Sequence, residues 1–360
     1  MKLVDITSQR LRNQHLTGER LATPRDVVAK LGAVQAQDYS GGKWAVAQRT
    51  RDAVDTTVEQ ALIDGSIIRT HVLRPTWHFV IPADIRWMLA LTAPRVKAAM
   101  GFQTRWLGQD ESALRRSGRA LTRALQGGKH LTRAEMSAVL AKAGLTVAGE
   151  QRLGNFLMHA ELEGIVCSGA RREKKFTYAL FDERIPVTSA MDRDEALLRL
   201  ANIYFTTRGP ATTSDFAWWS GLTVADAAKG IALAGSSVEK ASVEGQTYFF
   251  NPASSAGLTS SREAYLLPNF DEYAVAYKER GALGSRLKKS GITIRNDKSL
   301  ANIIVVDGQL IGTWKRTFKN GAVVVDATLL TPVNRSERKA VALAAEKYGD
   351  FLGIPAKLVI

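Results

Sequence analysis

Apolar residues recur every three or four positions after Thr132, which is the spacing of one buried face of an α-helix. Thr132 and Glu135 stand three residues apart, as in a capping box, and predict where this helix begins. Gly144 predicts its end, because glycine readily adopts the left-handed conformation that closes a helix. A second helix is expected from about Gly149 to Gly164.

After these helices the spacing changes to an alternation of apolar and polar residues, which predicts strands at residues 165–168 and 176–180. Two helices and a basic-tipped hairpin describe a winged helix, in which a helix can enter the major groove while the hairpin lies along the phosphates. Winged helices also bind proteins, and charged hairpin tips are commonly only solvated, so this alternative stays open. The candidate phosphate contacts at the tip are Arg171, Arg172, Lys174 and Lys175.

The same order of elements occurs near the start of the chain. Thr23-Pro24 is typical of a helix N-terminus, with an N-cap followed by proline at the first helical position. Thr57 is expected to open a second helix, and strand-like runs follow at residues 67–70 and 76–80. This part of the chain therefore predicts another winged helix.

A third copy is expected in the second half. A short helix is predicted around residues 215–220, and Thr223 is the expected cap of the next helix. The hairpin that follows covers residues 238–250 and turns at Glu244-Gly245.

The remaining segments show two other residue patterns. Residues 84–126 are helical and rich in arginine, which predicts a spacer. After residue 262 short β-rich runs alternate with Gly, Asn and Asp, Asp307-Gly308 is the clearest hairpin turn, and one amphipathic helix is expected at residues 335–348. The β-rich runs are residues 265–267, 292–294, 303–306, 310–314 and 322–325.

These patterns predict an α+β protein with three tandem winged-helix units and a small C-terminal β domain. We place the winged helices at residues 1–82, 128–186 and 187–260, the helical spacer at 83–127, and the β domain with its terminal helix at 261–360. A chain of 360 residues is long for one core and suits several modules.

The charge balance adds a candidate partner. The chain has 49 Lys and Arg against 35 Asp and Glu, a net charge of +14, and this excess suits a polyanion such as nucleic acid. Many proteins of high net charge never bind DNA, so the distribution matters more than the total. The basic residues form short patches instead of one long tail, which places the charge on folded surfaces.

Cysteine and histidine patterns narrow the chemistry. Cys167 is the only cysteine, which excludes an intramolecular disulfide and a multi-thiolate metal site. The five histidines lack metal-ligand spacing, and no Gly-rich phosphate loop is present, so we expect neither a metal nor a cofactor. No apolar run is long enough to span a membrane, and we expect a cytoplasmic protein.

Two glutamines, Gln35 and Gln37, stand one residue apart at the end of an apolar helical pattern. On a helix they would point in nearly opposite directions, whereas on an extended segment they share a face. The turn-rich residues 38–42 that follow favour extended backbone at the two glutamines. Glutamines at a helix end are commonly only solvated, so the pair needs support from elsewhere in the chain.

Several motifs, in order along residues 5 to 355, resemble the AlkZ-like family of bacterial DNA glycosylases, a winged-helix family that also includes the YcaQ-like branch. Each motif alone is weak, and together they are specific. They are Val34-Gln35-Ala36-Gln37-Asp38-Tyr39 with Trp44-Ala45, Arg74-Pro75-Thr76-Trp77-His78, Asp215-Phe216-Ala217-Trp218-Trp219-Ser220-Gly221-Leu222, Leu267-Pro268-Asn269-Phe270-Asp271-Glu272-Tyr273, and Gly312-Thr313-Trp314-Lys315-Arg316.

The resemblance implies a C-shaped array of three winged helices with a basic channel for double-stranded DNA. It also implies excision of alkylated purines, typically guanines substituted at N7, and in some members the unhooking of interstrand crosslinks. The family's catalytic Gln-x-Gln motif matches Gln35 and Gln37, whereas the YcaQ-like branch has Asp in place of the second Gln.

The chemistry of amides agrees with that substrate class. A glutamine amide does not titrate near pH 7 and cannot act as a general base. A guanine alkylated at N7 is cationic and leaves as a neutral base, so the enzyme needs only to stabilise the sugar oxocarbenium ion and position water. The carbonyls of Gln35 and Gln37 could do both if held rigidly.

Other residues are candidates for supporting roles. Asp38 is the rival base, but alternation from Gln37 points it to the opposite face. Arg74 and His78 could contact phosphate or the amides, although a Trp-His pair in a strand usually buries the Trp and exposes the His. Lys315 and Arg316 are candidate DNA contacts.

The motif acids and tryptophans are expected to be structural. Trp218 and Trp219 are expected to pack in the core instead of stacking on bases. Asp271 and Glu272 are left outside the catalytic set, because two adjacent acids make an improbable DNA contact.

The main alternative is a winged-helix transcriptional regulator, which would bind one operator and usually dimerise. A chain that already holds three such units has less need to dimerise, and we expect a monomer. A protein-interaction scaffold, for which the positive charge would be incidental, is the third hypothesis.

Overall fold

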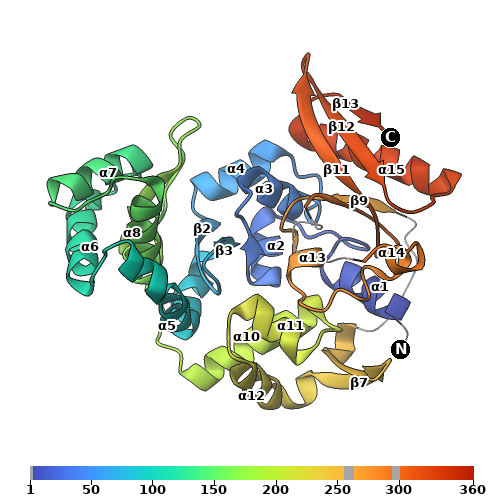
Figure 1. The fold of residues 1–360 in the computed structure, drawn as a ribbon, viewed down its shortest axis with the longest axis horizontal. Coiled ribbons are helices and arrows are strands. Elements are labelled where there is room, and N and C mark those ends of the chain that lie inside the picture. Colours follow the sequence, from blue (N-terminus) through green and yellow to red (C-terminus); the bar gives the residue numbers. More distant parts are fainter. Residues whose placement is uncertain (1–2, 255–262, 294–300) are drawn as a thin grey trace. The chain divides into compact units, whose positions relative to one another are not determined.

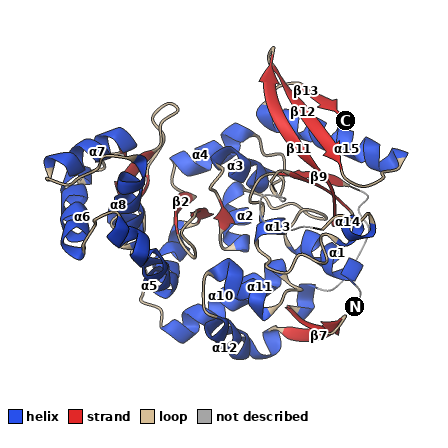
Figure 2. Ribbon diagram, viewed as in Figure 1, coloured by secondary structure: helices blue, strands red, loops and turns tan. Residues whose placement is uncertain are grey.

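The chain folds as a mixture of helices and small sheets, which confirms the predicted α+β class (Figures 1 and 2). The computed structural model describes residues 3–254, 263–293 and 301–360. Contacts divide the chain into two compact units, a first of residues 1–59, 197–219 and 223–360, and a second of residues 60–196 and 220–222. Both units are larger than the predicted segments, so the division into three winged helices stays a prediction.

The first unit opens with short helices and a two-residue strand. As predicted, Thr23 caps α2 in a capping box with Asp26, and Pro24 occupies the first turn. Gly32 ends this helix with a φ of 75°, which glycine adopts without strain. The elements are α1 (Leu3–Asn13), α2 (Pro24–Leu31), β1 (Val34–Gln35), α3 (Tyr39–Ala47) and the start of α4 (Asp55–Ile63).

Two details of the prediction for this region differ from the structure. The helix expected from Thr57 is present as α4, but it begins two residues earlier, at Asp55, and the Thr57 hydroxyl accepts the Val54 amide at 3.4 Å. Residues 38–42, expected to be rich in turns, are instead the N-cap and first residues of α3. Local glycine content predicted a turn, whereas packing against the rest of the unit favours a helix.

The middle of the first unit contains three helices and a hairpin. Thr223 caps α12 by accepting the Asp226 amide, as predicted. The predicted turn is also confirmed, since Glu244 and Gly245 adopt φ values of 50° and 77° between the paired strands. The elements are α10 (Arg193–Arg208), α11 (Thr213–Ser220), α12 (Val224–Ala234), β7 (Glu239–Val243), β8 (Gln246–Phe250) and 3₁₀ turns at Gly235–Ser237 and Pro252–Ser254.

A five-stranded sheet in the order β13-β12-β11-β10-β9 ends the first unit. Its neighbouring strands are antiparallel except for β12 and β13, and α15 contacts β9 and β13 (Figure 1). Asp307 and Gly308 form the predicted turn, with φ values of 48° and 74°. The elements are β9 (Ala264–Leu267), α13 (Glu272–Val275), α14 (Ser285–Lys289), β10 (Ile303–Val306), β11 (Gln309–Lys319), β12 (Ala322–Leu329), α15 (Arg335–Leu352) and β13 (Ala356–Val359).

One expected strand of this sheet is not observed. In the run at residues 292–294, Ile292 and Thr293 are not in a strand, and Ile294 lies outside the described residues. β13, which pairs in parallel with β12, was not predicted from the sequence.

The second unit is mainly helical. As predicted, Thr132 and Glu135 form the capping box of α7, and the core joins α6, α7 and α8 through Leu121, Met136 and Phe156. The strands β5 and β6 form an antiparallel hairpin, and β4 pairs with β6. The elements are β2 (Ile68–His71), β3 (Trp77–Val80), α5 (Pro82–Trp106), α6 (Glu111–Leu125), β4 (Leu131–Thr132), α7 (Arg133–Lys142), α8 (Glu150–Leu162), β5 (Val166–Ser168), β6 (Thr177–Leu180) and α9 (Phe181–Arg184).

Candidate active site

The two glutamines lie in the short connection between α2 and α3. Gln35 ends the strand β1, and Gln37 lies in a bend two residues later. Extended backbone is therefore confirmed at Gln35, and Gln37 lies beyond the strand. The Gln35 residue is only 5 % exposed, whereas Gln37 is exposed, so the second glutamine presents the larger surface to a substrate.

Asp38 is the N-cap of α3. Its Oδ1 accepts the Gly41 amide at 3.0 Å, and its Oδ2 lies 3.7 Å from Arg316 Nη2. A carboxylate at a helix N-terminus is stabilised by the cap hydrogen bond and by the helix dipole. The observed contacts give Asp38 a structural role at the end of the glutamine segment.

Gly41 allows the N-terminus of α3 and the segment at Pro268 to approach each other closely. A Cβ at position 41 would lie 2.6 Å from Asp38 Oδ2 and 3.1 Å from Pro268 Cβ. Gly41→Ala is therefore expected to displace the Asp38 carboxylate and to lower the free energy of unfolding by about 1–3 kcal/mol. Calorimetric unfolding would measure this loss.

A control for this prediction is Gly101→Ala, also within a helix. Its new methyl group would meet only the flexible Arg105 guanidinium, at 3.3 Å, so this variant should be neutral or stabilising. Equal stability of Gly41→Ala and the unmodified protein would contradict the proposed close packing.

Behind the glutamine segment lies a buried ion pair between Arg208 and Glu272. Glu272 Oε1 accepts the Gln35 amide at 2.9 Å, and its Oε2 accepts from Arg208 Nη2 at 2.6 Å. The indole nitrogen of Trp219 donates to the same Oε2 at 2.9 Å. Both charged side chains are 0 % exposed.

A second buried ion pair lies next to the first in the sequence. Arg49 donates to both oxygens of Asp271, at 2.8 and 2.9 Å, and also to Ala45 O in α3 and to Gln14. Asp271 in turn accepts the Tyr273 amide at the start of α13. Both acids of the motif thus make buried structural contacts, which agrees with leaving them outside the catalytic set.

Aromatic side chains from α15 pack against Trp44 of α3. Trp44 lies with its ring 5.2 Å from Tyr348 and 5.0 Å from Phe351, and its indole nitrogen donates to Leu266 O at 2.7 Å. Trp314 packs on the same Tyr348 ring at 5.1 Å. These motif tryptophans therefore belong to the core.

The two tryptophans of the α11 motif differ. Trp219 is fully buried, whereas Trp218 is 38 % exposed and donates its indole N–H to Val275 O at 3.0 Å. The expected packing role suits Trp219, and Trp218 shows part of its ring to solvent.

Arg74 and His78 belong to the second unit. His78 is fully buried on β3, with Nδ1 2.9 Å from Thr76 O, and Trp77 is only half-buried. The expected outward His is therefore wrong, because both faces of β3 are buried and Phe79, on the Trp77 face, is 0 % exposed. The Arg69 guanidinium lies 4.2 Å from the Trp77 ring. Arg74 is half-buried in the connection between β2 and β3, and its support of the glutamines stays a prediction.

The basic tip of the hairpin β5–β6 contains both paired and exposed cations. Arg172 pairs with Glu135 at 2.9 Å, and Arg171 lies 5.2 Å from the Phe176 ring. The Thr132 backbone amide and Arg172 lower the pKa of Glu135 to about 2, so this carboxylate is ionised at neutral pH. Lys174 and Lys175 are exposed. These two lysines are the freest of the four to meet a phosphate.

Lys315 and Arg316 lie on opposite faces of β11, because successive strand residues alternate. Lys315 is exposed, and Arg316 Nη1 donates to the Tyr348 hydroxyl at 3.2 Å on the face that also holds Trp314. One flat DNA surface cannot engage both side chains in the same way.

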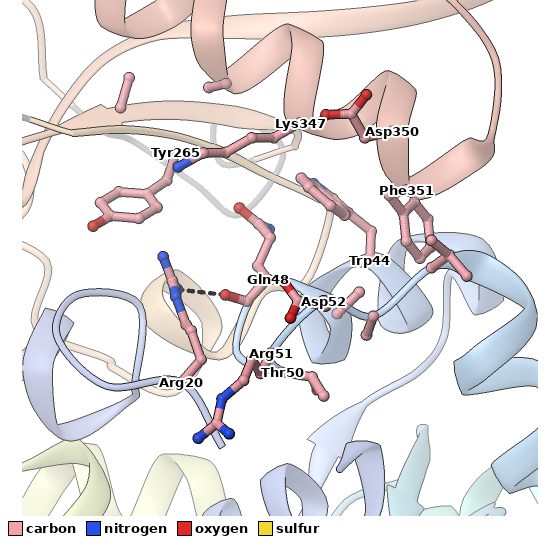
Figure 3. Close-up of a pocket in the computed structure, with 15 residues that line it drawn as sticks. Arg20, Trp44, Gln48, Thr50, Arg51, Asp52, Tyr265, Lys347, Asp350 and Phe351 are labelled. Carbon is pink, nitrogen blue, oxygen red and sulfur yellow. Dashed lines mark hydrogen bonds between the residues drawn. The ribbon is translucent and has the colours of Figure 1, made fainter. Parts of the chain in front are cut away.

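A separate cavity of about 440 Å³ lies beside the C-terminal half of α3 (Figure 3). Its lining includes Trp44, Gln48, Tyr265 and Lys347, and Arg20 donates to the Gln48 carbonyl at its edge. Neither glutamine of the motif lines it. The cavity is therefore distinct from the glutamine segment.

Metal and thiol chemistry find little support in the described parts of the chain. Among these residues no group of three or more His, Cys, Asp or Glu side chains is placed to hold a metal ion. Burial raises the pKa of the Cys167 thiol to about 12, which keeps it protonated at neutral pH. Likewise, no described helix combines the length and apolar character that crossing a membrane requires.

The contact of Glu272 and its partner Arg208 with the glutamine segment was not predicted from the sequence. Glu272 is 237 residues from Gln35 in the chain and 64 from Arg208, so no local pattern links them. The position of Glu272 in a shared motif was the only sequence signal.

Comparisons with known proteins agree with the resemblance. A family model described as "DNA glycosylase AlkZ-like" matches residues 28–351. The chain is 26 % identical over 381 residues to an "Interstrand DNA cross-link repair glycosylase" from Streptomyces sahachiroi, with 97 % of each chain covered. The solved structure of Streptomyces sahachiroi DNA glycosylase AlkZ has a TM-score of 0.80 and 24 % identity, with 100 % of both chains covered.

Proposed function

The chain belongs to the AlkZ-like family of DNA glycosylases, and from this premise we propose that it hydrolyses the N-glycosidic bond of cationic N7-alkylated purines in double-stranded DNA. The product strand would carry an abasic site. The observation that supports this substrate class is the pair Gln35 and Gln37, two amides that cannot supply a general base.

The proposed reaction begins with a leaving group that is already activated. The bond between C1′ of the sugar and N9 of the purine breaks, its electron pair moves to the cationic base, and a neutral alkylpurine leaves. Water then adds to the C1′ oxocarbenium ion and loses a proton to solvent. No step requires the enzyme to protonate the base.

The glutamines would act through their dipoles. The carbonyl oxygen of Gln37, which is exposed, could face the developing positive charge at C1′ and orient the attacking water. Gln35 is nearly buried at the end of β1, where its rigid backbone fixes the start of the segment. Unmodified guanine would be spared, because it is a poor leaving group.

DNA binding is proposed to follow from the basic surfaces. Three winged helices in a C-shaped array would hold the duplex, with Lys174 and Lys175 on a hairpin tip and Lys315 on β11 as phosphate contacts. We propose that the protein acts as a monomer in the cytoplasm. The related Streptomyces protein is named for interstrand crosslink repair, and we extend the proposed activity to crosslinks joined through N7 of guanine.

The purified protein is expected to release N7-methylguanine from duplex DNA treated with a methylating agent and to leave abasic sites. Mass spectrometry of the released bases, across a panel of alkylators, measures both the activity and the adduct preference. Tight binding to one DNA sequence without release of any cationic purine would instead support the transcriptional regulator.

A further inference from the structure

The carboxylate of Glu272 contacts the backbone of the glutamine segment directly. Oε1 accepts the Gln35 amide, while Oε2 accepts from Arg208 Nε at 3.0 Å, Arg208 Nη2 at 2.6 Å and Trp219 Nε1 at 2.9 Å. Both oxygens are thus used, and the side chain is completely buried. Rotation of this carboxylate would break at least two hydrogen bonds at once.

Arg208 holds the residues that precede Gln35. Its Nη1 donates to Leu31 O at 2.8 Å, and its Nη2 donates to Ala33 O at 2.9 Å. The guanidinium also lies 4.2 Å from the Trp219 ring, which limits its movement. One ion pair therefore contacts three backbone groups between residues 31 and 35.

Stability alone is a weak reason for such a pair. Burying two charges is costly, and replacing a buried ion pair with apolar residues of similar volume is often neutral or stabilising. Here the hydrogen bonds fix the end of α2 and the strand β1, the scaffold on which Gln35 and Gln37 stand. A neutral amide stabilises charge only when its dipole is preorganised, so small displacements of this scaffold matter.

We propose that Glu272, with Arg208 and Trp219, positions the glutamine segment for base excision. These three are positioning residues, since they act through the backbone of residues 31–35 and not on the substrate. The inference rests on the proposed glycosylase activity and adds to it a device that sets the reaction rate without contributing to DNA binding.

Asp271 provides a matched control. It is the preceding residue, it is also a buried carboxylate, and it is paired with an arginine in a bidentate geometry. In the described chain its side-chain contacts are to Arg49 and the Tyr273 amide, outside the glutamine segment. Glu272→Gln and Asp271→Asn therefore remove the same charge from equally buried sites.

The test compares single-turnover excision rates and affinities for lesion-free duplex DNA at a temperature where both variants remain folded. Glu272→Gln is expected to lower the rate by about fivefold with affinity within about twofold, and Asp271→Asn to keep both within about twofold. Equal rate losses in the two variants would overturn the proposal, because they would report a general structural effect.

Trp219→Phe keeps the ring in the core but removes one hydrogen bond to Glu272 Oε2, so it provides a milder test if Glu272→Gln does not fold. We expect about a twofold fall in rate with unchanged affinity. An unchanged rate in Trp219→Phe would count against the proposal. Absence of excision by the unmodified protein would contradict the proposed function itself, which separates the two failures.

Discussion

Replacing Gln37 with alanine is expected to lower the single-turnover rate of base excision by at least about tenfold while the affinity for duplex DNA stays nearly intact. Gln37 is exposed, and it follows a strand whose backbone is held by Glu272. Truncation removes the side-chain dipole and leaves the hydrogen bond from the Gln35 amide to Glu272 in place. The measurements are the excision rate at saturating enzyme and the dissociation constant for the same duplex.

Asp38→Asn is the control that separates amide chemistry from carboxylate chemistry. Asparagine is as good an N-cap as aspartate, so the cap on Gly41 should survive. The lost ion pair with Arg316 is partly exposed and contributes about 1 kcal/mol or less. A larger rate loss in Asp38→Asn than in Gln37→Ala would identify Asp38 as the base. Equal loss of binding and excision in Gln37→Ala would show that Gln37 is structural.

The elements that could be predicted from the sequence are those fixed by short-range hydrogen bonds. Thr132 with Glu135, Thr23 with Asp26, and the Asp307-Gly308 turn each complete their contacts within four residues, and all three are confirmed. The turn predicted around Gly41 is wrong. Glycine is needed at this position because a Cβ would clash with Asp38 and Pro268. Glycine is favoured both in turns and where two segments approach closely, and the sequence alone does not distinguish these two reasons.

Within the candidate site, the sequence located the glutamines but not the groups that hold them. The Gln35 amide donates to Glu272, which in turn accepts from Arg208 and Trp219, and only the tertiary fold brings these residues together. The opposite faces of Lys315 and Arg316, in contrast, could have been predicted from strand alternation. The burial of His78 could not, because it depends on tertiary packing that covers both faces of β3.

Loss of the Arg49–Asp271 pair should produce a large loss of stability. Asp271→Asn leaves the Arg49 guanidinium, which is 1 % exposed, without a counter-charge. Removing one partner of a buried pair costs about 3–5 kcal/mol, which corresponds to a fall in Tm of roughly 6–20 °C for a unit of this size. Calorimetry of the first unit's unfolding transition would measure it.

A surface substitution of the same kind, Glu19→Gln, shows how much of the expected fall in Tm comes from burial. Glu19 lies 3.9 Å from Arg51, and its side chain is 88 % exposed, so Glu19→Gln also neutralises a carboxylate beside an arginine. Exposed pairs contribute little because water already solvates both charges, and Tm should change by about 2 °C or less. Similar shifts in the two variants would mean that Arg49 is resolvated when Asp271 is lost. In that case the Arg49–Asp271 pair would not anchor α3 to α13.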